Sequence, residues 1–362
     1  RNDQAVRLAE EAEQIQVPTG RAAIGGGLAA SFDGNVPANV RSVVNAAIAE
    51  WDAALETPVP VNVRIFWQCF NSPGLLGFAG PTDIYVRNGL IYPASLAHSL
   101  AGSDLNGATS EIEITLNAEL TTNTSCNFSF DDWYISTNTN PSGSQIDLYS
   151  VVLHEVGHGL GFLGSAQDPD GGGFAQAQLS FPRFIYDTFV YAGSTPLLSL
   201  PSPNSELTGN NLFFDLGGER LHRIYAPSTF QNGSSFSHFD PIYFGGEPGE
   251  LMTPALGPGE VRRALDAPVL GLLAQQGWGI APRAVTPSIA IQTSPAQISV
   301  SWDPNLDQTG TPPLSYRVRA FAGGTLMAER TVAGGEDGVA LNQLTNGVEY
   351  RVEVTPYDIK GA

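Results

Sequence analysis

The spacing of apolar residues alternates between helical and strand patterns along this chain. Between residues 37 and 55 they recur every three or four positions, which predicts an amphipathic helix whose buried stripe is Val40, Val44, Ile48, Trp51 and Leu55. A Pro-Val-Pro sequence ends that helix, and residues 61–67 then alternate as a strand. Residues 269–278 read as a last helix closed by Gly277. These patterns predict an α+β domain.

Residues 109–117 alternate strictly between apolar and polar positions. Ile112, Ile114 and Leu116 would face one side, and Glu113 and Thr115 the other. The pattern predicts a half-exposed strand, which we expect at the edge of a sheet.

The last part of the chain has a different pattern. Pro282 to Pro287 indicates a linker, and short alternating strands follow at 298–302, 316–320 and 350–354. With Trp302 in an early strand, and Leu344 and Tyr350 at a later corner, residues 287–362 resemble a fibronectin type III module. We expect an all-β sandwich whose final strand lies beyond residue 362.

The strongest chemical signal is His154-Glu155-Val156-Gly157-His158, which follows an apolar run from Leu148 to Leu153. Histidines four positions apart lie on one face of a helix, so both imidazoles can reach one metal ion. Glu155 between them can serve as general base. Only 5 histidines occur among the 362 residues, and this motif predicts a Zn²⁺ site on a helix capped by Ser144 or Asp147.

A catalytic zinc needs a third protein ligand and an open position. The residues leave several candidates for that ligand: Asp168, Asp170, Asp187, His98, His222 and His238. Gly161 stands where the chain leaving the helix would need a positive-φ turn. This stretch resembles the long metzincin motif, in which the next histidine falls three residues after that glycine; that position here is Gly164. Asp147, about two turns before His154, is a candidate acceptor for the second ring nitrogen of a ligating histidine.

The motif His-Glu-x-x-His-x-x-Gly-Phe, a distant Ser237-His238 and then Glu250-Leu-Met-Thr-Pro254 together resemble the leishmanolysin branch of the metzincin metallopeptidases. The resemblance covers roughly residues 30–280. It implies that His154, His158 and His238 are the zinc ligands, that Glu155 is the base and that Met252 belongs to a turn beneath the metal. It also implies that an edge strand, residues Ile112, Glu113, Ile114, Thr115 and Leu116, pairs with an extended substrate.

The resulting division is an N-terminal arm at 1–30, a metzincin-like zinc peptidase domain at 31–281, with a mixed sheet and an active-site helix, and the fibronectin type III-like domain at 287–362. Asp168 and Asp170 are also candidates for Ca²⁺, although Asp-Pro-Asp-Gly is typical of a plain turn.

Composition narrows the partners and the compartment. The net charge of −19 disfavours binding to nucleic acid or anionic membranes, and no apolar run is long enough to span a bilayer. The only two cysteines, Cys69 and Cys126, are expected to form a disulfide in an exported protein whose signal has been removed. Lys360 is the only lysine, a bias that suits a GC-rich bacterial genome.

Two functions fit these observations. The first is a secreted zinc endopeptidase that acts on protein or peptide substrates. The second is an adhesion protein that binds an extracellular matrix or cell-surface target through its C-terminal module, with the zinc domain as a catalytically weak scaffold. Glu155 favours the first function, because a structural zinc site does not need a base.

Overall fold

A computed structural model describes the chain at residues 26–72, 74–107, 110–121, 126, 132–169, 177–215, 221–244, 250–265, 267–280, 290–301, 315–322, 325–333 and 338–357. The chain divides into two compact units, Arg1–Gly279 and Ile280–Ala362. The expected linker at 282–287 lies outside the described residues, as does most of the expected arm at 1–30.

A four-stranded sheet forms the centre of the first unit, in the order β1-β3-β7-β4. Strands β1 (Gly27–Phe32), β3 (Pro60–Gln68) and β7 (Ile112–Asn117) run parallel, and β4 (Gly77–Pro81) is antiparallel to β7. Alternate residues of β3, among them Val61, Val63 and Ile65, are fully buried. The apolar alternation of the sequence therefore supplies one face of the core.

The prediction that residues 112–116 form an edge strand is wrong. Ile114 pairs with Ile65 of β3 on one side and with Ala79 of β4 on the other, so β7 lies inside the sheet. Alternation shows that the two faces of a strand differ, but it does not show whether both backbone edges are paired. The strand at this edge of the sheet is β4.

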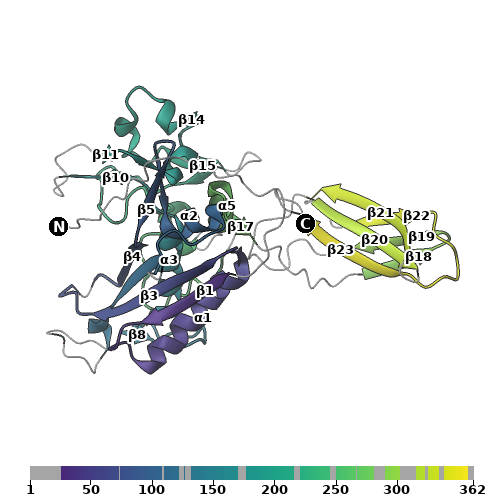
Figure 1. The fold of residues 1–362 in the computed structure, drawn as a ribbon, viewed down its shortest axis with the longest axis horizontal. Helices are drawn as coiled ribbons and strands as arrows, with labels where there is room; N and C mark the ends of the chain where they lie inside the picture. Colours follow the sequence, from purple (N-terminus) through teal and green to yellow (C-terminus); the bar gives the residue numbers. More distant parts are fainter. Residues whose placement is uncertain are drawn as a thin grey trace. The chain divides into compact units, whose positions relative to one another are not determined.

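Two helices lie side by side against this sheet (Figure 1). Helix α1 (Ala38–Ala54) packs against β1 and α3, and α3 (Leu148–Leu160) packs against β4 and β7. The predicted stripe of α1 is buried, and Trp51 Nε1 donates to the Leu153 carbonyl at 3.0 Å. The helix pair thus holds the His-Glu-x-x-His segment against the centre of the unit.

Shorter elements complete the first unit. The helices are α2 (Ala94–Ala101), α4 (Pro241–Phe244) and α5 (Ala267–Gln276), which Gly277 follows as predicted. The short 3₁₀ segments are η1 (Ala118–Leu120), η2 (Ile185–Phe189), η3 (Leu197–Ser199), η4 (Pro203–Glu206) and η5 (Glu250–Met252).

The remaining strands of the first unit form small sheets. They are β2 (Leu55–Glu56), β5 (Ile84–Arg87), β6 (Leu90–Pro93), β8 (Trp133–Tyr134), β9 (Ile146–Asp147), β10 (Ala166–Gln167), β11 (Gln178–Leu179), β12 (Arg183–Phe184) and β17 (Gly279–Ile280). Between the motif helix and His238, a separate sheet has the order β14-β13-β15-β16. Its strands are β13 (Val190–Ala192), β14 (Thr195–Pro196), β15 (Leu212–Asp215) and β16 (Leu221–Arg223).

The second unit is the predicted β-sandwich. One sheet has the order β18 (Ala290–Ser294), β19 (Gln297–Ser301), β22 (Gly338–Asn342), and the other has the order β21 (Thr325–Ala333), β20 (Ser315–Ala322), β23 (Arg351–Tyr357). Both sheets contribute to one buried core, which includes Val300, Val318 and Leu341. Trp302 lies outside the described residues.

The predicted disulfide is confirmed. Cys69, just after β3, is bonded to Cys126, which lies 57 positions later in the sequence, and their Cα atoms are 5.5 Å apart. Among the helices that the structure describes, none has the length and apolarity to cross a bilayer.

Candidate metal and catalytic site

The start of α3 is fixed by a network around the buried carboxylate of Asp147. This residue caps the helix as predicted, accepting from the backbone N–H of Ser150 at 3.2 Å and from its hydroxyl at 2.6 Å. Arg263 donates to both carboxylate oxygens, at 2.8 and 2.5 Å. The helix that bears the motif is therefore anchored about two turns before His154.

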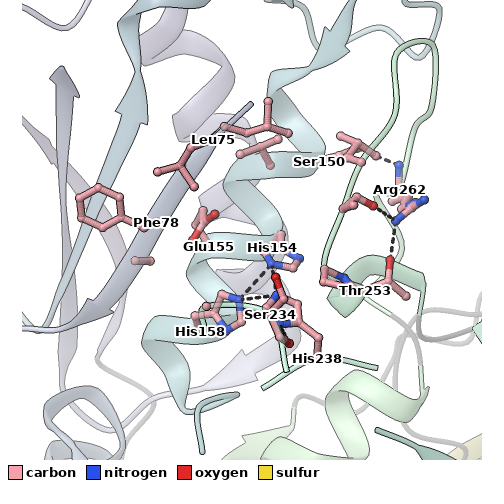
Figure 2. A pocket seen from close by; sticks show the side chains of 18 of the residues that line it. Leu75, Phe78, Ser150, His154, Glu155, His158, Ser234, His238, Thr253 and Arg262 are labelled. Carbon is pink, nitrogen blue, oxygen red and sulfur yellow. Dashed lines mark hydrogen bonds between the residues drawn. The ribbon is translucent and has the colours of Figure 1, made fainter. Parts of the chain in front are cut away.

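The structure brings His154, His158 and His238 together, although 80 residues separate the last two (Figure 2). The three Nε2 atoms are 3.0, 3.1 and 3.2 Å from one another. His158 and His238 are buried, and His154 is partly buried. Three side chains from two distant segments thus point their ring nitrogens at one point.

The other ring nitrogen of each histidine meets a backbone carbonyl. The distances from Nδ1 are 2.7 Å to Leu251 O for His154, 2.8 Å to Phe162 O for His158 and 2.7 Å to Ser234 O for His238. A carbonyl only accepts hydrogen bonds, so each Nδ1 carries the proton of its neutral ring. The three Nε2 atoms then face one another with lone pairs and cannot hydrogen-bond together. Such an arrangement is repulsive unless a cation occupies its centre.

Burial keeps these imidazoles neutral. It lowers the pKa of His154 to about 3, with further lowering by His158, and the pKa of His158 to about 4. The pKa of His238 also lies well below its usual range, through burial first and the two other rings second. Neutral imidazole is the form that binds a metal ion.

Glu155 lies beside the three histidines in the same cleft, which has a volume of about 670 Å³. Its side chain is on the β4 side of α3 in Figure 2, next to Gly77 of β4, where a Cβ would lie in van der Waals contact with Oε1 at 3.4 Å. Burial raises the pKa of Glu155 to about 8. A nearby divalent cation would favour the ionised carboxylate.

Met252 underlies the helix between the two motif histidines. It is fully buried, and a Cβ on Gly157 would lie only 2.8 Å from its sulfur, so a larger residue there would displace the Met252 side chain. The Met252 carbonyl accepts from Phe239 N at 2.8 Å, and the preceding Leu251 carbonyl meets His154. This turn therefore links the segment that carries His238 to the motif helix.

The helix ends at Gly161 in the expected positive-φ turn, with φ of +122°. The turn puts the Phe162 carbonyl at His158 Nδ1. Shortly after it, Gly164 N donates to Ser237 Oγ at 3.0 Å. The segment that carries His238 therefore reaches the position where a nearby third histidine would stand.

Other predicted candidates lie elsewhere. The described ligand atoms gathered around His154 and His158 come from His238 and not from His98, His222, Asp168 or Asp187. Asp187 accepts hydrogen bonds from Ser165, and Asp168 pairs through its backbone with Asn232. Asp170 lies outside the described residues. Asp147 does not contact His154, because its carboxylate binds Ser150 and Arg263 instead.

Sequence reasoning missed the acceptors of the three Nδ1 protons and also missed Arg263. The acceptors are backbone carbonyls, which every residue has, so no residue type could mark them. Arg263 lies 116 positions from Asp147, and only its place between the Met252 turn and α5 could have drawn attention to it.

Comparison with known proteins adds information on fold alone. No protein-family model and no curated protein sequence matches the chain. Solved structures that match include fibronectin type III domains, among them the chicken CNTN1 FN1-FN3 domains at 20% identity and TM-score 0.18, covering 21% of this chain and 26% of that chain. A human contactin 1 fn3 domain matches at 20% identity and TM-score 0.19, covering 22% and 67% of the two chains. A human collagen XX FN3 domain matches at 31% identity and TM-score 0.19, covering 22% and 86%.

Proposed function

We propose that this protein is a zinc-dependent endopeptidase of the metzincin type. The observation that carries the proposal is the convergence of three Nε2 atoms at 3.0–3.2 Å, each on a ring whose Nδ1 meets a carbonyl. Ligands about 2.0–2.1 Å from a tetrahedral zinc lie roughly 3.3 Å apart, so the donor set fits that ion. Three histidines would leave the fourth position open to the cleft.

The three histidines would hold a zinc ion, which would supply a Lewis acid for the scissile carbonyl and for a water nucleophile near pH 7. Proton transfer and the orientation of the ligand rings depend on groups of the chain itself. The carboxylate of Glu155 takes the proton of the attacking water and returns it to the leaving amine nitrogen. The three carbonyls at 162, 234 and 251 fix the tautomer and orientation of the ligand rings.

The cleft also suggests how a substrate lies. Strand β4 ends the sheet, and no described strand pairs with its outer edge, so an extended peptide can add to it by backbone hydrogen bonds. Leu75 and Phe78 line the cleft on this side and remain 44% and 53% exposed (Figure 2). We infer a substrate with apolar side chains near the cleaved bond.

The disulfide supports export from the cell, because disulfides persist in oxidising compartments. We propose an extracellular site of action, with the β-sandwich unit as an anchor to a matrix or surface target. Calcium at Asp168 and Asp170 stays a prediction from the sequence.

Paired substitutions test the proposal. Glu155→Gln should retain zinc but cleave unfolded casein about 100- to 10 000-fold more slowly, because the proton acceptor is lost while the ligands remain. His238→Ala should lose the zinc of the histidine cluster on dialysis. His222→Ala is the matched control, since His222 lies outside the cluster, and should keep both zinc and activity. Near-wild-type cleavage by Glu155→Gln would exclude the proposed role of the carboxylate.

A further inference from the structure

A second group of metal-ligand side chains lies in the first unit, formed by His98, Asp104 and Glu111. His98 is on α2, Asp104 is in the turn after it and Glu111 directly precedes β7. One ligand atom from each lies within 4.8 Å of the others. None of the three lines the cleft of the histidine cluster, so this is a separate place in the fold.

His98 is fully buried, yet neither ring nitrogen has a hydrogen-bond partner among the described residues. Its Nδ1 points at two carboxylate oxygens, 3.5 Å from Glu111 Oε1 and 3.8 Å from Asp104 Oδ1. These distances exceed those of a hydrogen bond. Donors that share one ion at about 2.0–2.2 Å each lie roughly 3–4 Å apart, as His98 Nδ1 does from each of these two oxygens.

The carboxylates are held in place by backbone groups. Glu111 is 1% exposed, and its Oε2 accepts from Asn62 N at 2.6 Å, which leaves Oε1 facing His98. Asp104 Oδ1 accepts from the N–H groups of Asn106 and Gly107, both at 3.0 Å. A buried carboxylate needs a positive charge nearby.

We propose that His98, Asp104 and Glu111 bind a second divalent cation with a structural role. Two carboxylates balance the charge of such an ion, and a mixed imidazole and carboxylate set favours a first-row ion such as Zn²⁺ over Ca²⁺. The Asp104 side chain is 44% exposed, which gives the ion a path from solvent and room for water ligands. The ion links the turn after α2 to the start of β7, the strand with which β4 pairs.

Zinc stoichiometry of the full chain, measured by mass spectrometry after equilibrium dialysis against buffered Zn²⁺, tests this proposal. Wild type should bind two equivalents, and Asp104→Asn should bind one while keeping the wild-type circular dichroism spectrum. The amide retains an oxygen for the two N–H groups, so the turn should persist. Asp83→Asn is the matched control: Asp83 accepts from Asn106 Nδ2 nearby but lies outside the group, and two equivalents are expected.

His238→Ala separates this site from the proposed catalytic one. It should retain one equivalent, and the double variant His238→Ala/Asp104→Asn should retain none. A wild-type chain with a single equivalent that His238→Ala loses and Asp104→Asn keeps would overturn the second site and leave the first intact. His98 and Glu111 would then be an ion pair without a metal.

Discussion

Arg263 donates two hydrogen bonds to the buried carboxylate of Asp147, and its guanidinium also lies 4.2 Å from the ring centre of Tyr149. Further donors of Arg263 bind the carbonyls of residues 136–138. The ion pair of Arg263 and Asp147 thus holds the segment after the Met252 turn against the N-terminus of the motif helix.

Asp147→Ala should lower the free energy of unfolding by about 3–5 kcal/mol, because it removes the helix cap and leaves the Arg263 charge without its partner. Asp147→Asn keeps a capping oxygen and should cost less. Glu113→Gln is the control, since its pair with Arg64 is nearly half exposed and 3.9 Å long, and it should change stability by less than about 1 kcal/mol. Urea unfolding measures all three. Equal effects for Asp147→Ala and Glu113→Gln would contradict this role.

The disulfide should stabilise the first unit. Closing a 57-residue loop is worth about 4 kcal/mol in the chain-entropy model. The double variant Cys69→Ser/Cys126→Ser should therefore unfold at a lower urea concentration than the oxidised chain. Wild type treated with reductant should match the double variant, and a reductant-insensitive unfolding midpoint would contradict the prediction.

Acid should destabilise the metal-free chain through the histidine cluster. The pKa of His154 falls to about 3 and that of His158 to about 4 on folding, from ordinary values near 6.5. Between the folded and unfolded pKa values, the unfolded chain binds more protons at these rings than the folded chain does. The contribution of the two neutral rings to the free energy of unfolding is therefore fully present above pH 6.5 and is lost as the pH falls toward 4. Each ring contributes up to about 1.4 kcal/mol per pH unit.

Urea unfolding of chelator-treated protein from pH 7.5 to 4.5 measures this effect. His158→Gln removes one of the titrating rings and should reduce the slope, whereas His222→Ala should leave it unchanged. The buried carboxyl of Glu155, whose pKa is raised to about 8, changes stability in the opposite direction over this range, so the comparison of slopes decides. Equal slopes for the metal-free wild type and His158→Gln would contradict the burial of the cluster.

The sequence revealed local features well and non-local ones poorly. The motif helix, its cap at Asp147 and its exit at Gly161 follow from residue types at fixed spacing, and all are present. His238 could be suggested only through the resemblance around Met252, because an 80-residue gap has no geometric meaning of its own.

The order of strands could not be read from the pattern. Ile112, Ile114 and Leu116 alternate with polar residues, which led us to expect an edge strand. The outer backbone edge of β7 is nevertheless paired with β4. Gly77 and Gly80 interrupt the apolar alternation of β4, so it gave a weak signal. The group around His98 was equally hidden, because its members come from three separate local segments.

The two units should function separately in the simplest assay. Removing residues 287–362 takes away the β-sandwich core, whereas the three histidines, Glu155 and Met252 all lie in the first unit. The truncated chain should therefore keep zinc and cleave a short fluorogenic peptide at nearly the wild-type rate. A soluble, zinc-loaded truncation that fails on the short peptide would show that the sandwich contributes to the cleft.

The proposed catalytic centre requires a zinc ion between the three Nε2 atoms. An anomalous difference map recorded at the zinc edge, from crystals of the full chain, addresses this directly. We expect a peak about 2.0–2.1 Å from Nε2 of His154, His158 and His238. A map from zinc-soaked crystals without density at that point, or with the zinc bound by Asp168 or Asp187 instead, would contradict the proposed catalytic centre.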